Sequence, residues 1–66
     1  MTDTDRNTIA AMIAFGGSFV RHLGEAARYA DSENIARLKT AWPEYWARYE
    51  TLAGQRPVRP SNKETD

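Results

Sequence analysis

The sequence predicts an all-α protein: an antiparallel two-helix hairpin, with the second helix kinked or broken at Pro43, that dimerises into a four-helix arrangement. Apolar residues recur in steps of three and four through two long segments, which is the spacing of one helix face. Only Asp31-Ser32 separates these segments, and so short a connection joins antiparallel neighbours. The chain has 66 residues and no Cys, so a homodimer is the remaining way to bury enough apolar surface.

The first helix is expected from about Asn7 to Ala30, after a polar lead-in over residues 1–6. Thr4, Asp5 or Asn7 is the expected cap, because a side-chain oxygen there accepts a hydrogen bond from a free N–H group at the helix start. The apolar stripe of this helix comprises Ile9, Met12, Gly16, Phe19, Leu23, Ala26 and Ala30.

Gly16-Gly17 lies inside this predicted helix, where each glycine costs roughly 1 kcal/mol relative to Ala. A phosphate-binding loop is a poor interpretation, since no strand precedes the pair and no Lys-Ser/Thr follows it. Close helix packing is the better one. Gly17 shares a small-residue face with Ala10, Ala14 and Gly24, and Gly16 lies on the main stripe.

His22 is the single histidine of the chain. It suits a pH switch or a metal ligand, and His22 and Glu25 would be duplicated in a two-fold dimer. Without a second His or any Cys, a metal site is not expected. We interpret His22 as a partly buried, hydrogen-bonded side chain.

The second helix is expected to be capped by Ser32 or Asp31 at its start and to end near Gly54. Pro43 interrupts it and leaves two alternatives: one helix with a kink, or a short helix that ends near Ala41 and another that starts with Pro43. The apolar phase continues unchanged across Pro43, which favours a kinked or briefly broken helix. The stripe comprises Ile35, Leu38, Trp42, Tyr45, Tyr49 and Leu52.

These helices make one domain, residues 7–54, followed by a polar tail, residues 55–66, expected to be extended or disordered. The residues assigned to the core or the dimer interface are Ile9, Met12, Gly16, Gly17, Phe19, Leu23, Trp42 and Tyr45.

The segment from Ala41 to Tyr49 holds both tryptophans and two of the three tyrosines. Tyr, Trp and Arg are the side chains that most often anchor protein interfaces. Trp46 lies off the centre of the stripe, so we expect it to face either the dimer mate or a target protein. The predicted partner-binding residues are Arg37, Glu44, Trp46, Arg48 and Tyr49.

Composition restricts the classes of function. Nine basic and nine acidic residues cancel, which argues against nucleic acid or an anionic membrane surface as the main partner. No apolar run approaches the ~20 residues of a membrane span. The polar N-terminus does not resemble a signal peptide, so a cytoplasmic protein is expected. No catalytic constellation is visible, and we expect neither an enzyme nor a cofactor site.

The chain also resembles a known group of proteins. The residues that carry the resemblance are Phe15-Gly16-Gly17-Ser18-Phe19-Val20, then Ala30-Asp31 and Asn34, then Leu38 through Trp42-Pro43-Glu44-Tyr45-Trp46. This pattern, over about Asn7 to Leu52, is similar to small helical proteins of Pseudomonas temperate phages, and most similar to the quorum-sensing anti-activators.

The resemblance implies a dimerising two-helix hairpin in the host cytoplasm. It also implies binding to a host LuxR-type quorum-sensing activator, which blocks its DNA binding, and to the type IV pilus extension ATPase. The alternative hypothesis is a structural or assembly protein, in which the aromatic residues form only core and dimer interface.

Overall fold

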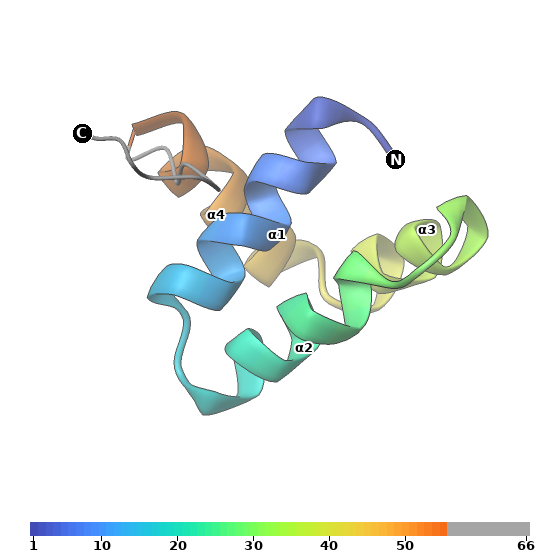
Figure 1. Cartoon of the computed structure of the whole chain (residues 1–66), viewed down its shortest axis with the longest axis horizontal. Coiled ribbons are helices and arrows are strands. Elements are labelled where there is room, and N and C mark those ends of the chain that lie inside the picture. The colour runs from blue at the N-terminus through green and yellow to red at the C-terminus, as the bar shows by residue number, and fades with distance from the viewer. Residues whose placement is uncertain (56–66) are drawn as a thin grey trace.

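The structure is a computed structural model that describes residues 1–55, and this part of the chain is all-α, with helices as its only regular secondary structure, as predicted. α1 packs along α2 and along α4, whereas α3 makes smaller contacts with α2 and α4. Figure 1 shows α1 at the centre, between α4 and α2. The expected tail beyond Gln55 lies outside the described residues. The helices are α1 (Asp3–Phe15), α2 (Ser18–Arg28), α3 (Ser32–Ala41) and α4 (Pro43–Gln55).

The prediction of one long first helix is wrong, because the chain leaves the helix at Gly16-Gly17. Gly16 (φ −78°, ψ 158°) and Gly17 (φ −73°, ψ −172°) are both extended. The break lets α2 fold back on α1, so that their apolar faces bury each other. The apolar spacing of the sequence does not reveal the break, because the predicted stripe keeps the same helical spacing before and after Gly16-Gly17. The cost of two adjacent glycines in a helix was the signal against continuity.

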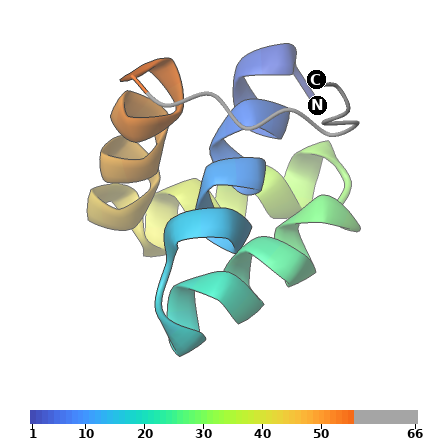
Figure 2. The ribbon, with the colours of Figure 1, turned by 60° about the vertical axis from the view of Figure 1, so that its left-hand side comes forward.

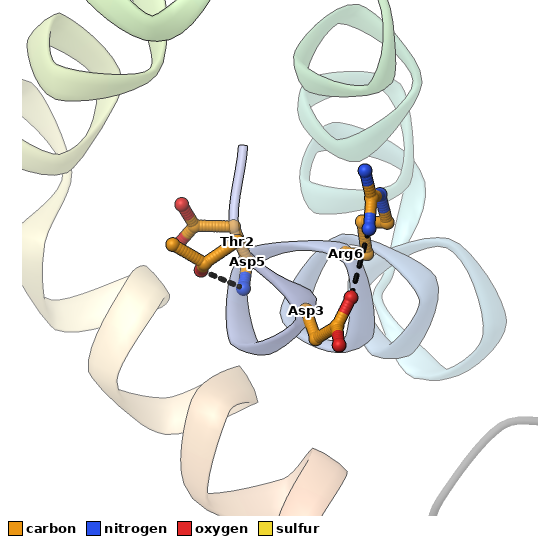
Figure 3. A network of polar contacts seen from close by, with 4 residues as sticks. All are labelled: Thr2, Asp3, Asp5 and Arg6. Carbon is orange, nitrogen blue, oxygen red and sulfur yellow. Dashed lines mark hydrogen bonds and ion pairs between the residues drawn. The ribbon is translucent and has the colours of Figure 1, made fainter.

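The first helix also begins earlier than expected, at Asp3, within the predicted lead-in. Thr2 caps it: the Thr2 Oγ1 accepts a hydrogen bond from the Asp5 N–H at 3.0 Å, as Figure 3 shows. The pattern Thr2-x-x-Asp5 is a variant of the capping box, in which the cap and the third helical residue satisfy each other's N–H groups. That pattern is visible in the sequence and locates the true start.

At Pro43 the structure adopts the broken alternative. α3 ends at Ala41, Trp42 is non-helical (φ −131°, ψ 57°), and Pro43 is the first residue of α4. A residue before proline is pushed away from helical angles, and proline fits a first helical position because its missing N–H needs no partner there. At the other end of α3, Asp31 accepts a hydrogen bond from the Asn34 N–H at 2.9 Å, which confirms Asp31 as a cap.

All four helices contribute to one hydrophobic core. Met12 on α1 is completely buried, and so is the Thr8 side chain, whose hydroxyl donates to the Thr4 carbonyl at 2.8 Å. In the described part of the chain, no helix is long and apolar enough to cross a membrane. The buried apolar residues are Ile9, Ala11, Met12, Val20, Ala27, Ile35, Trp46, Tyr49 and Ala53.

Small size matters at two glycines, but Gly17 is not one of them. Gly24 lies where α2 packs closely against α1, because a Cβ at this position would lie 3.0 Å from the Met12 Cβ. A Cβ at Gly16 would lie 2.5 Å from the Met12 carbonyl oxygen and 2.8 Å from Val20 Cγ1. A Cβ at Gly17 would meet nothing within 4 Å. The assignment of Gly17 to close packing is therefore wrong within the monomer.

The adjacent glycines give a matched pair of substitutions. We expect Gly16→Ala to lower the free energy of unfolding by about 1–3 kcal/mol, because a new methyl group collides with fixed backbone and with Val20. Gly17→Ala should change it by less than ~0.5 kcal/mol, since Ala restricts the unfolded chain but is a poorer N-cap. Urea unfolding monitored by circular dichroism measures both. Equal effects would contradict the close approach at Gly16.

Candidate protein-binding surface

Three aromatic rings from different segments meet at the surface of the protein, and we call Phe19, Trp42 and Tyr45 the aromatic patch. The Phe19 and Trp42 ring centroids lie 5.2 Å apart at an interplanar angle of 69°, an edge-to-face pair. Tyr45 lies 5.9 Å from each of the other two rings. Such geometry is the preferred one for aromatic pairs and contributes about 0.5–1.5 kcal/mol beyond burial.

Local structure explains why the rings meet. Phe19 lies in the first turn of α2, directly after the glycine break. Trp42 occupies the non-helical link between α3 and α4, and Tyr45 lies in the first turn of α4. The two breaks in the chain, at Gly16-Gly17 and at Trp42-Pro43, thus supply the rings of the patch.

The patch remains open to solvent despite its internal contacts. Phe19 is 52% exposed and Trp42 is 40% exposed, while Tyr45 is half-buried against the core. A contiguous exposed aromatic surface is unusual on a small protein and marks a place where another molecule can bind. The patch is therefore the candidate site.

The predicted burial of the two tryptophans is wrong. Trp46, predicted to lie at the edge, is only 5% exposed and belongs to the core with Tyr49, whereas Trp42, predicted as core, is exposed. The helix break at Trp42 is the reason, because it ends the register that α3 and α4 were expected to share. α4 turns the face of Trp46, Tyr49 and Ala53 inward. Tyr49 lies on the predicted stripe, but Trp46 and Ala53 each come one position after the predicted Tyr45 and Leu52.

Of the other predicted partner-binding residues, Tyr49 is buried in the core, which contradicts its assignment, whereas Arg37, Glu44 and Arg48 are exposed. Arg37 pairs with Glu33 on its own helix at 2.9 Å. Glu44 and Arg48 are exposed on α4, and within residues 1–55 no ion pair involves either of them. Their roles in binding stay predictions.

Some of the residues on α1 and α2 that were assigned to the core or the dimer interface are buried, and others are exposed. Ile9 and Met12 are buried, and Leu23 is half-buried against the core. Phe19 instead belongs to the exposed patch. Gly16 fits only because it lacks a side chain, as described above.

His22 is exposed, so the expectation of partial burial is wrong, although its expected hydrogen bond is present. Its Nδ1 donates to the Ser18 carbonyl one turn earlier, at 2.7 Å. In the described residues, no group of three or more His, Cys, Asp or Glu side chains is placed to hold a metal ion.

An interhelical ion pair is the feature that sequence reasoning missed. Lys39 Nζ on α3 lies 2.9 Å from Asp5 Oδ1 on α1, and the Asp5 side chain is only 9% exposed. Burial raises the pKa of Asp5, but the Lys39 ammonium and hydrogen bonds from Thr2 outweigh it, so the pKa lies below its ordinary value of 3.8. The Lys39 ammonium also lies 5.6 Å from the centroid of the Trp46 ring. No local pattern connects residues so far apart in the sequence.

Beside this ion pair, the first turn of α1 and α3 enclose a hollow of about 250 Å³. Its surface is mainly apolar. The lining residues are Met1, Thr2, Asp5, Ser32, Ile35, Ala36 and Lys39.

Comparison with known proteins adds no relative to this description. No family model, no curated protein and no solved structure matches the chain.

The two tryptophans should respond differently to truncation. We expect Trp46→Ala to lower the free energy of unfolding by about 3–5 kcal/mol, the range for large aromatic residues in a core. Trp42→Ala should cost about 1–2 kcal/mol, because it removes ring contacts from a side chain that is already partly in water. Thermal unfolding of both variants measures the difference, and a larger loss for Trp42→Ala would contradict the burial described here.

The ion pair predicts a pH-dependent effect of Asp5→Asn. Because the folded-state pKa of Asp5 is lowered, its charge stabilises the fold above pH 4, and this contribution is lost as pH falls through the lowered value. At pH 7 we expect Asp5→Asn to cost about 1–3 kcal/mol, the range for a hydrogen bond to a charged group. Chemical unfolding at pH 7 and pH 2.5 should show the gap between wild type and variant shrinking in acid. A gap of constant size would contradict the assignment.

Proposed function

We propose that this protein is a non-enzymatic inhibitor that binds a host protein through the aromatic patch. The observation that carries the proposal is the exposed cluster of Phe19, Trp42 and Tyr45, brought together at the two breaks in the helices. Aromatic anchors give large contact area at low entropic cost, because each side chain has few torsions to order on binding.

The nature of the partner comes from the resemblance to phage anti-activators. The proposed partner is a host LuxR-type activator, which the protein would keep from its DNA site, and the type IV pilus extension ATPase is a second proposed target. Direct competition by binding DNA is disfavoured by the zero net charge. A cytoplasmic location follows from this choice of partner and is part of the proposal.

A second candidate function is a structural or assembly homodimer, with the patch as its interface. The favouring observation is that the patch consists of three rings, so two copies can cover one another without burying a charge. A chain with so small a hydrophobic core is also stabilised when a second copy buries the patch. The two functions are compatible, but they predict different consequences of losing the patch.

The discriminating experiment uses Trp42→Ala, with Tyr29→Ala as its matched control. Tyr29 is 80% exposed at the end of α2 and does not belong to the patch. We expect Trp42→Ala to weaken binding to a purified LuxR-type activator by about thirtyfold or more, the loss typical of a hot-spot residue. Tyr29→Ala should bind like the wild type. Calorimetry measures the affinity, and an electrophoretic mobility assay measures release of the activator's DNA.

Light scattering on the same samples separates the candidates. If wild type has twice the 7.5 kDa mass of one chain and Trp42→Ala is a folded monomer, the patch is the dimer interface. If the mass is unchanged while binding to the activator is lost, the patch is the partner site. Equal affinity of wild type and Trp42→Ala would exclude the patch as the partner site.

A further inference from the structure

α3 is the helix least embedded in the fold. Of its ten residues, only Ile35 is buried, and Leu38 packs partly against the core. The two extensive helix interfaces, α1 with α2 and α1 with α4, do not include it. In Figure 2, α3 (yellow-green) passes behind α1 toward α4. Segments with few buried apolar contacts are the ones that open at low free-energy cost.

One side chain ties α3 to two other helices. The hollow between α3 and the first turn of α1 leaves that side incompletely filled. Lys39 reaches across it to Asp5 on α1, and its ammonium also lies over the Trp46 ring on α4. Removing the Lys39 charge therefore removes both polar attachments of α3 at once, while Ile35 and Leu38 keep their apolar contacts.

Both ends of α3 have short non-helical links. At its start the chain passes from Tyr29 to the Asp31 cap, and at its end Trp42 alone joins it to α4. Trp42 is also a ring of the aromatic patch. Movement of α3 about these links must therefore move a patch residue.

We propose that α3 is a hinged lid, seated on the core beside Trp46 through its own Ile35 and held closed by the Asp5–Lys39 ion pair. Opening exposes the Trp46 ring and displaces Trp42 from Phe19, so the lid sets the shape of the aromatic patch. The importance of that second effect for binding rests on the proposed function. The lid itself does not, because it is a property of the free protein.

Hydrogen exchange of the free, full-length chain tests the lid. Lys39→Met removes the ammonium and keeps an apolar stem of similar length, and Arg37→Met is the matched control, since Arg37 pairs only within α3 in the described residues. We expect amides of α3 to be less protected than those of α1 and α4 in the wild type, and to exchange about tenfold faster still in Lys39→Met. Arg37→Met should leave all four helices as in the wild type.

Protection of α3 equal to that of α1 and α4 in the wild type would overturn the lid, because it signals global rather than local unfolding, and so would no change in α3 in Lys39→Met. A second measurement needs no variant: in wild type at low denaturant, exchange of α3 should be insensitive to denaturant, as in local opening. Exchange of α3 that follows global unfolding would refute the proposal. Neither measurement involves the activator, so a failed binding assay and a failed lid are distinguishable.

Discussion

The close approach of α2 to α1 is the constraint on which the rest of the structure depends. Gly24 lets the two helices meet at Met12, and Gly16 lets the chain reverse without striking the Met12 carbonyl. With α2 seated on one side of α1, α4 occupies another and closes the core with Trp46 and Tyr49. A chain of this length has few apolar residues to spare, so its packing depends on such tight contacts rather than on a large interior.

The fold class and the Asp31 cap were predictable from the sequence, because spacing and capping chemistry are local. The number of helices was not. The apolar residues keep the same helical spacing across both Gly16-Gly17 and Pro43. Such spacing does not show whether the chain reverses direction at a break. At Pro43 the sequence left two alternatives, and the structure adopts the broken one.

The candidate site was predicted on Trp46, whereas the exposed aromatic patch contains Trp42. A helix that restarts at Pro43 need not keep the stripe of the helix before it. Trp46 turns into the core, whereas Trp42, in the non-helical link, stays exposed. Phe19 was assigned to the core because it lies on a stripe, yet its place in the first turn of α2 leaves half of it in solvent. The Asp5–Lys39 pair joins distant parts of the sequence, and pairing of that kind follows only from the tertiary fold.

The position of α1 between α2 and α4 also bears on how the protein folds. α1 can pair with α2 as soon as both have been made, since only a short turn separates them. Its other partner, α4, follows two further helices along the chain, so this second interface requires closure of a longer loop. During synthesis, the face of α1 that contacts α4 therefore stays uncovered until α4 has been made. The contacts of Trp46 and Tyr49 with α1 therefore form only after α1 and α2 are both available to pair.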